Sequence, residues 1–281
     1  MEEQYKTGIV DQALEHPVKY TVMLTKEVIT LNKRLFLGIT AIVTLLMYLS
    51  AIPIVGMVAS ILSGILLFTL FYFIGKTFYR SQTMDEFVDA IRSMTLADLW
   101  KNYLKPASGA YLGWAALSLV MLLLTGALVS LSGHGDSLIV AIQSGDPSVM
   151  LDAMPAMILP FILIALLMYV SPLVLANVIK ADNFNDAFKA VFTFFSKDVW
   201  RRAFTGEYFK YMTVLGLIML AFLFVMAIVS AVIMAIFGAL GSYMLIAGIV
   251  VVTIAMMFLQ VVMNVFFAIS SVIADRLTQQ Q

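Results

Sequence analysis

Two stretches of the chain, one hundred residues apart, carry related sequences: TMDEFVDAIRSMTLADLWKNYLKPASGAYLGWAALSLVM at residues 83–121 and NFNDAFKAVFTFFSKDVWRRAFTGEYFKYMTVLGLIMLA at residues 183–221. Each begins with a residue that can cap a helix, continues through an amphipathic segment and enters an apolar run. The identities at the constant offset are Ala90 and Ala190, Asp98 and Asp198, Trp100 and Trp200, Tyr111 and Tyr211, and Leu117 and Leu217. Matching caps, charge pattern and position before an apolar run indicate an internal duplication.

The composition places this duplication in a membrane protein. Of the 281 residues, 62% are hydrophobic and only 12% are charged, and the mean hydropathy is +0.99. An ordinary soluble domain has about 25% charged residues. The formal net charge is zero, so no basic excess points to nucleic acid. The absence of cysteine excludes disulfides, thiolate metal sites and cysteine nucleophiles.

Apolar runs close to the roughly 20 residues that a bilayer core requires predict about six transmembrane helices. We therefore expect an all-α polytopic fold with one membrane domain over residues 35–276. A cytoplasmic or interfacial arm at 1–34 precedes it and a short tail at 277–281 follows it. Pro17 and the apolar spacing after it predict an interfacial helix that runs into the first span; the alternative is a cytoplasmic helix that extends that span. The expected spans are 35–50, 54–78, 109–131, 155–178, 209–237, and a sixth from the turn at 238–242 to about residue 274.

The repeated stretches predict pairs of amphipathic helices at the membrane surface. Thr83 with Glu86 and Thr95 with Asp98 match capping boxes, so we expect two short helices before Pro106. The full copies of the repeat then lie near 54–133 and 155–237. Because the second and fourth spans run in the same direction, the repeat is parallel rather than inverted.

The positive charges predict the orientation in the membrane. With these spans, all 17 Lys and Arg fall on one side, and the three opposite connections have none. By the positive-inside rule, both termini and both repeated segments should be cytoplasmic in a cell (inner) membrane.

Small residues mark one face of the second span. Gly56, Ser60 and Gly64 follow one another at four-residue steps, which lets another helix approach closely. That helix can belong to the same chain or to a second copy.

Three motifs resemble those of a known group of proteins. These are Lys33-Arg34 directly before the first span, the Ile-Pro-Ile-Val-Gly turn at residues 52–56, and the aspartate-led Asp186-Ala187-Phe188 before a later span. In them, and in most of its layout, the chain resembles uncharacterised bacterial and archaeal multi-pass membrane proteins known only as a domain of unknown function. The resemblance implies a helical integral membrane fold and supplies no catalytic residues.

The predicted spans contain almost no charge. Residues 35–75, 109–135, 153–179 and 211–274 have no Asp, Glu, Lys or Arg, which argues against a proton-coupled pump or a voltage sensor. Gln260 and Asn264 are the most polar pair deep in a span and share a face of the sixth. They either line a path for a substrate or make interhelical hydrogen bonds, as such amides commonly do.

No motif predicts a catalytic, cofactor-binding or metal-binding residue. His16 and His134 fall on opposite sides of the membrane and cannot act as paired axial ligands. A divalent-ion site and an ordinary solvated loop are the alternatives for the outer loop with His134, Asp136, Asp146 and Asp152. The 19 methionines are scattered through the spans, which favours packing over copper binding. We find no phosphate-binding loop and no nucleophile motif.

The repeated segments hold the remaining candidate residues. Their aromatic and basic side chains predict contacts with lipid headgroups or with a partner; they are Trp100, Lys101, Tyr111, Trp200, Arg201, Arg202 and Tyr211. One interpretation is that they anchor the fold at the membrane surface. The other is that the two segments flank a lipid- or partner-binding groove open to the cytoplasm.

These observations together favour a non-enzymatic integral membrane protein that acts by binding. It would serve as a scaffold or accessory subunit of a membrane assembly or of lipids. Its expected partners are membrane lipids and a membrane protein or a second copy, and it should have no cofactor and no nucleic-acid partner. The alternatives are a transporter or channel for an uncharged or lipidic substrate and, third, a membrane-embedded enzyme.

Overall fold

The structure, a computed structural model, describes residues 9–131, 136, 140 and 147–279. These residues form eleven α-helices and one 3-10 helix, and no strand occurs among them. The all-α prediction is therefore confirmed. Five helices are long and apolar enough to cross a membrane: α4 (Val55–Arg80), α6 (Leu96–Leu131), α8 (Pro147–Lys180), α11 (Gly206–Ala239) and α12 (Ser242–Gln279). A bent pair, α2 (Pro17–Leu31) and α3 (Lys33–Leu49), gives a sixth if it counts as one span. The protein is a polytopic membrane protein.

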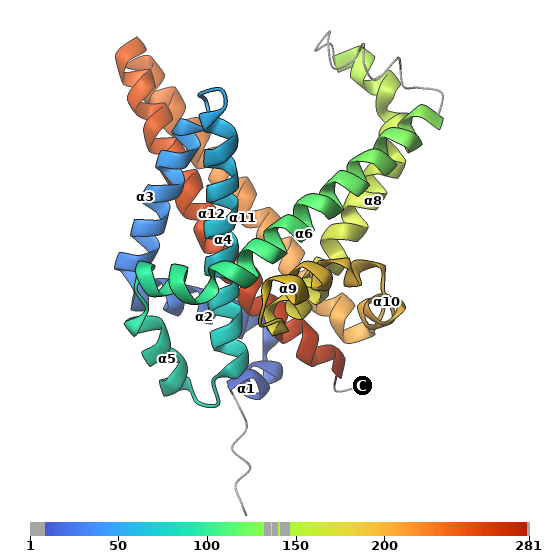
Figure 1. The fold of residues 1–281 in the computed structure, drawn as a ribbon. Coiled ribbons are helices and arrows are strands. Elements are labelled where there is room, and N and C mark those ends of the chain that lie inside the picture. Colours follow the sequence, from blue (N-terminus) through green and yellow to red (C-terminus); the bar gives the residue numbers. More distant parts are fainter. Residues whose placement is uncertain (1–8, 132–135, 137–139, 141–146, 280–281) are drawn as a thin grey trace, which may run out of the picture.

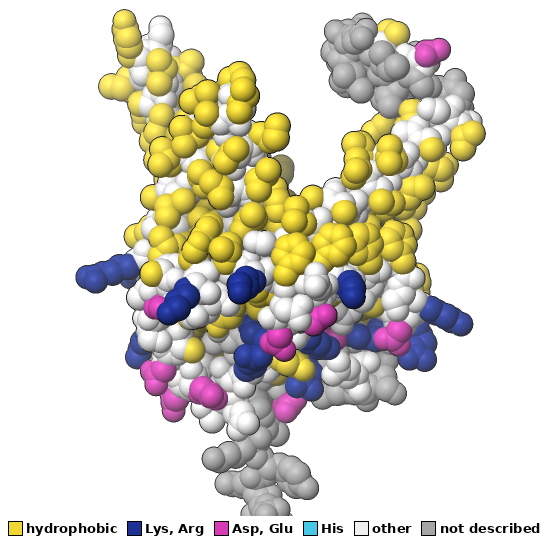
Figure 2. All heavy atoms as spheres, in the orientation of Figure 1, with side chains coloured by type: hydrophobic (Ala, Val, Ile, Leu, Met, Phe, Trp, Pro, Cys, Tyr) yellow, Lys and Arg dark blue, Asp and Glu magenta, His cyan; other side chains and the backbone are white. Residues whose placement is uncertain are grey.

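The long helices diverge from a common base into two arms (Figure 1). The four-helix arm contains α3, α4, α11 and α12, and the two-helix arm contains α6 and α8. Short helices gather at the base: α1 (Ile9–Glu15), α5 (Met84–Ser93), α9 (Phe184–Val191), the 3-10 helix η1 (Phe192–Phe195) and α10 (Lys197–Ala203). With all heavy atoms drawn, an open gap remains between the two arms (Figure 2), and we call it the cleft.

Asn32 forms the corner between α2 and α3, whose axes differ by 89°. Its Oδ1 accepts a hydrogen bond from the backbone N–H of Leu35 at 3.1 Å and so caps α3. Its Nδ2 donates to the carbonyls of Ile91 and Met94 at the end of α5, at 2.8 and 2.9 Å. One side chain thus starts a helix and holds the corner against α5.

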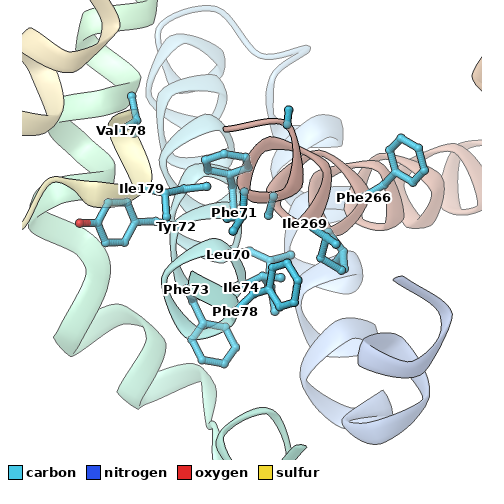
Figure 3. Close-up of a cluster of buried hydrophobic side chains, with 14 of the residues drawn as sticks. Leu70, Phe71, Tyr72, Phe73, Ile74, Phe78, Val178, Ile179, Phe266 and Ile269 are labelled. Carbon is cyan, nitrogen blue, oxygen red and sulfur yellow. The ribbon is translucent and has the colours of Figure 1, made fainter. Parts of the chain in front are cut away.

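The core lies at the base rather than in the middle of the spans. The second half of α4, from Leu66 to Phe78, is buried on nearly every side, and so is the end of α12 from Val265 to Thr278. Figure 3 shows their large side chains packed together, with Ile179 from the end of α8 beside them. Because these two segments are buried on nearly every side, α4 and α12 are the central helices of the base.

The first repeated segment differs from the prediction in one respect. Its second amphipathic helix is not separate but continues through the buried Pro106 into the third span as α6. In Figure 1, α6 runs across the base in front of α4 and then rises into the two-helix arm. Proline removes only one backbone donor, and surrounding helices can compensate for it within a membrane protein, so the helix persists.

The caps at the start of the two segments occupy equivalent positions. Thr83 accepts a hydrogen bond from the N–H of Glu86 at 3.3 Å, and Asn183 accepts one from the N–H of Asp186 at 2.9 Å. The second segment then divides into α9, η1 and α10 before α11 begins. Both capping predictions are confirmed, while descent from one duplicated unit stays a prediction.

The small residues of α4 contact their own chain. A Cβ added at Gly56 would lie 2.2 Å from the Ser50 carbonyl oxygen in the turn after α3. At Gly64 it would lie 2.2 Å from the ring of Tyr111 on α6. The close approach that these glycines permit is therefore within one molecule, to a turn at Gly56 and to another helix at Gly64.

Candidate functional site

Charged side chains gather at the base, below the hydrophobic arms (Figure 2). Two clusters of them join elements of the different arms. The first centres on Asp275 near the end of α12, and the second on Asp182 after the end of α8. Both clusters fix the position of the arms relative to each other.

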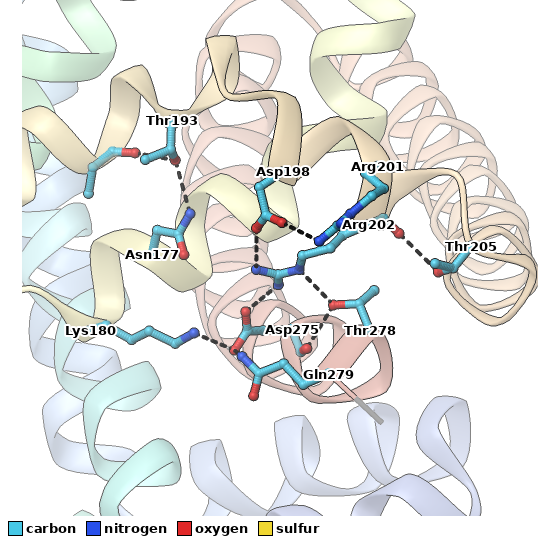
Figure 4. A network of polar contacts seen from close by, with 11 residues as sticks. Asn177, Lys180, Thr193, Asp198, Arg201, Arg202, Thr205, Asp275, Thr278 and Gln279 are labelled. Carbon is cyan, nitrogen blue, oxygen red and sulfur yellow. Dashed lines mark hydrogen bonds and ion pairs between the residues drawn. The ribbon is translucent and has the colours of Figure 1, made fainter. Parts of the chain in front are cut away.

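Asp275 is a buried carboxylate, with only 2% of its side chain exposed. Arg202 of α10 donates to its Oδ1, and Lys180 Nζ of α8 lies 2.6 Å from its Oδ2. The Arg202 Nε also donates to the Thr278 hydroxyl at 3.0 Å (Figure 4). A buried charge requires this degree of pairing, since an unpaired one costs several kcal/mol. The cluster therefore ties α8 and α10 to α12.

Lys76 forms the second cluster from inside the core. Its side chain is 6% exposed, and its Nζ donates to the carbonyls of Lys180 and Ala181 at 3.1 and 2.9 Å. It also lies 2.8 Å from Asp182 Oδ1, which Arg80 reaches at 2.9 Å. The hydrogen bond and charge of Lys76 hold the pKa of the Asp182 carboxyl below its usual range. This cluster ties the end of α4 to the end of α8.

A pocket of about 300 Å³ lies where the two arms meet. We call it the arm-junction pocket; α4, α6, α8 and α12 all contribute to it. Aromatic and aliphatic side chains dominate, with a serine and an asparagine among them; the lining residues are Phe68, Phe71, Trp114, Leu167, Met168, Ser171, Leu175, Asn264 and Phe267. An apolar cavity with a few polar groups is typical of sites for small apolar ligands.

Only one residue of the predicted intramembrane pair, Gln260 and Asn264, lines this pocket. Asn264 lines it, whereas Gln260 does not and is exposed. The Asn264 Nδ2 donates to the carbonyl of Gln260 at 2.8 Å, within the same helix. The two amides therefore share a helix face without forming a common binding site.

Trp100 and Lys101 lie together at the start of α6. They line a hollow of about 770 Å³ that also borders Ile42 of α3 and Leu66 of α4. Trp100 is exposed and Lys101 has its side chain at the surface. Both positions are open to lipid or to a partner, as the prediction for these residues requires.

The other interfacial candidates mostly face the protein. The Tyr111 ring packs edge-on against Phe68, and Trp200 Nε1 donates to the Phe194 carbonyl at 2.7 Å. Tyr211 is buried, and its hydroxyl lies 2.8 Å from that of Thr21. These three aromatic residues position helices rather than present a free surface.

The two adjacent arginines of α10 have different environments. Arg201 is 78% exposed and pairs with Asp198 within its own helix at 2.9 Å. The side chain of Arg202 is only 15% exposed because it turns inward to Asp275. Of the two, only Arg201 is placed to meet lipid headgroups.

The ion site considered for the outer loop is not tested by the structure. His134 and Asp146 lie outside the described residues, as does the side chain of Asp152. The alternatives of an ion site and a solvated loop both stay predictions. Within the described ranges, no group of three His, Asp or Glu side chains comes together.

Sequence reasoning missed the residues that hold the base together. Lys76 and Asp275 are each the first residue after an uncharged run, and both are readily interpreted as solvated end charges. Their position in the sequence could have indicated burial, because each directly follows a long apolar run and lies within an uninterrupted helix. Thr278 carried no signal, because its role depends on α10 lying beside it.

Comparisons with known proteins give no relative on which to base a function. No protein-family model, curated protein or solved structure matches this chain.

Proposed function

We propose that this protein is a non-enzymatic component of a cell (inner) membrane that acts by binding another membrane component in its cleft. It would serve as a scaffold or an accessory subunit. The observation that carries the proposal is the divergence of the two arms above the arm-junction pocket. Figure 2 shows the hydrophobic walls of both arms facing an open gap.

The exposure of the spans supports this proposal. In the most apolar part of α11 no residue is buried inside the protein, and in that of α6 only 17% are. Much of this surface contacts lipid, as in every membrane protein. A membrane-embedded partner that enters the cleft would in addition gain close packing from both walls, which lipid chains provide less well.

The base also supports the proposal, because its ion pairs fix the two arms relative to each other. The pairs Lys76–Asp182 and Lys180–Asp275 each join an element of the two-helix arm to one of the four-helix arm. Together with the buried core around Phe73 and Phe78, they give the cleft a fixed floor. A preformed cleft lowers the conformational cost of binding.

We also propose an orientation of the protein in the membrane. The Lys and Arg side chains of the base would face the cytoplasm, together with both ends of the chain, and the cleft would open toward the far leaflet.

Photo-crosslinking from the cleft tests the proposal. A photoreactive amino acid at Met168, an exposed residue of the arm-junction pocket, is compared in native membranes with one at Leu37, which is exposed on α3. We expect a discrete protein adduct from Met168 and none from Leu37. An adduct with a second copy would identify a homo-oligomer. Adducts with lipid alone from both positions would contradict the proposal.

A second candidate function is favoured by the amide in the arm-junction pocket. Asn264 offers a hydrogen-bonding group beside four aromatic rings, which suits an uncharged or lipidic solute on a transport path. In reconstituted vesicles, Asn264→Leu should then abolish flux of such a solute, while Gln260→Leu, outside the pocket, should leave it intact. Equal flux through both folded variants would remove this candidate.

A further inference from the structure

A groove runs between α2 and α11, and none of its lining residues lines the arm-junction pocket. It consists of two hollows. The first, of about 360 Å³, lies at the charged base between Val18 of α2 and Glu207, Lys210 and Val214 of α11. The second, of about 160 Å³, lies between Val22 of α2 and Ile218 and Phe222 of α11.

The spacing of the lining residues places the two hollows one after the other along the same two helices, and we treat them as one groove. Val18 and Val22 are four residues apart on α2, and Val214, Ile218 and Phe222 follow at four-residue steps on α11. Residues four apart lie on one face of a helix, so each wall continues from one hollow into the next. The hydroxyls of Thr21 and Tyr211, hydrogen bonded at 2.8 Å, join the two helices at the floor.

The groove is polar at one end only. Glu207 and Lys210 are exposed at the base, and neither has an ion pair or side-chain hydrogen bond with any other described residue. Beyond Val214 the walls are apolar apart from Thr25, and Val262 and Phe266 of α12 complete them. From Lys210 to Phe222 the helix rises about 18 Å, close to the depth of one leaflet, half of a core of about 30 Å.

From this polarity and length we infer that the groove binds one membrane phospholipid whose headgroup carries both a phosphate and a primary ammonium. The phosphate meets Lys210 and the positively polarised first turn of α11, the ammonium meets Glu207, and one acyl chain follows the wall from Val214 to Phe222.

The balance of charges selects this headgroup. Glu15 and Lys19 line the adjoining hollow at the break between α1 and α2, which shares Pro17 and Val18 with the groove. The polar end thus presents two carboxylates and two ammonium groups, and the His16 side chain lines the same hollow as Glu15 and Lys19. A purely anionic headgroup would meet uncompensated carboxylates there. A quaternary ammonium has no N–H to donate to Glu207.

Native mass spectrometry of the delipidated full-length protein tests the inference with three lipids of identical acyl chains. Their headgroups are ethanolamine, choline and glycerol. We expect the ethanolamine lipid to bind with the highest affinity. Lys210→Ala should weaken its binding roughly tenfold, as the loss of a charge-assisted contact does. Lys197→Ala, which removes an exposed lysine of α10, should leave it unchanged.

A second pair of variants tests the acyl-chain position. Val214→Trp fills the groove and should abolish specific binding, while Leu220→Trp, at an exposed position outside both hollows, should not. Equal affinity for the three lipids, preference for the glycerol lipid, or unchanged binding by Val214→Trp would each overturn the inference. Because the groove shares no lining residue with the arm-junction pocket, these results are independent of the crosslinking result at Met168.

Discussion

At the scale of single residues, the buried carboxylate of Asp275 is the group on which the base depends most. It accepts contacts from Arg202, Lys180 and Gln279, which come from α10, α8 and its own helix. The sequence placed Arg202 among charges facing lipid, because at interface depth a free arginine and a paired one have the same local pattern. The paired arginine can be recognised only in the structure, where α12 places Asp275 beside Arg202 of α10.

The adjacent arginines give a matched test of this difference. Arg202→Ala should lower the free energy of unfolding by about 3 kcal/mol, since it removes one of the two cations from a buried carboxylate. Arg201→Ala should change it by less than about 0.5 kcal/mol, because its pair with Asp198 is exposed. Unfolding of both variants from lipid micelles by a denaturing detergent measures the two values. Equal losses would show that the Asp275 cluster does not stabilise the base.

At the scale of elements, the backbones of α6 and α9 approach each other closely at two glycines. A Cβ at Gly109 would lie 2.1 Å from the carbonyl oxygen of Phe184, and one at Gly113 would lie 2.9 Å from that of Phe188. These glycines are four residues apart, so a small-residue face of α6 lets the backbone of α9 approach. This contact holds the second repeated segment against the helix that begins in the first.

A single methyl group tests the role of this contact. Gly109→Ala should destabilise the protein by about 1–3 kcal/mol, because the backbone of α9 must move away. Gly126→Ala on the same helix meets nothing within 4 Å and should be neutral or stabilising by up to about 1 kcal/mol, since alanine favours the helix. Thermal unfolding in detergent compares the two. A neutral Gly109→Ala would mean that α9 is not docked as described.

Much of this element structure is readable from the sequence. Apolar length predicted the spans, and the caps at Thr83, Thr95 and Asn183 marked helix starts that the structure contains. The continuity of α6 through Pro106 and the 89° corner at Asn32 could not be predicted. Each depends on partners distant in sequence: the helices around Pro106, and the carbonyls at the end of α5.

At the scale of the whole molecule, the positive charges gather at one end of the long helices. Every described Lys and Arg belongs to the base or to helix ends that meet there, and the opposite helix ends have none. The divergence of the arms had no signal in the sequence. A span that faces lipid and a span that faces another helix are equally apolar, so hydropathy alone cannot place the cleft or the arm-junction pocket.

Cysteine labelling tests the orientation, and the natural chain has no cysteine to interfere. Tyr243→Cys, at an exposed position in the first turn of α12, should react with a membrane-impermeant reagent added outside intact cells. Lys197→Cys on α10 should react only after the membrane is opened. The reverse pattern would invert the topology and place the base outside.

The central claim is that the arms stand apart in a membrane and leave a cleft that a partner can enter. Spin labels at Leu131→Cys near the tip of α6 and at Tyr243→Cys near the tip of α12 allow the distance between the arms to be measured by pulsed electron resonance in native-lipid nanodiscs. The account predicts well-separated tips. A single short distance, near the roughly 8–10 Å axial spacing of packed helices, would show that the arms close into one bundle and would contradict it.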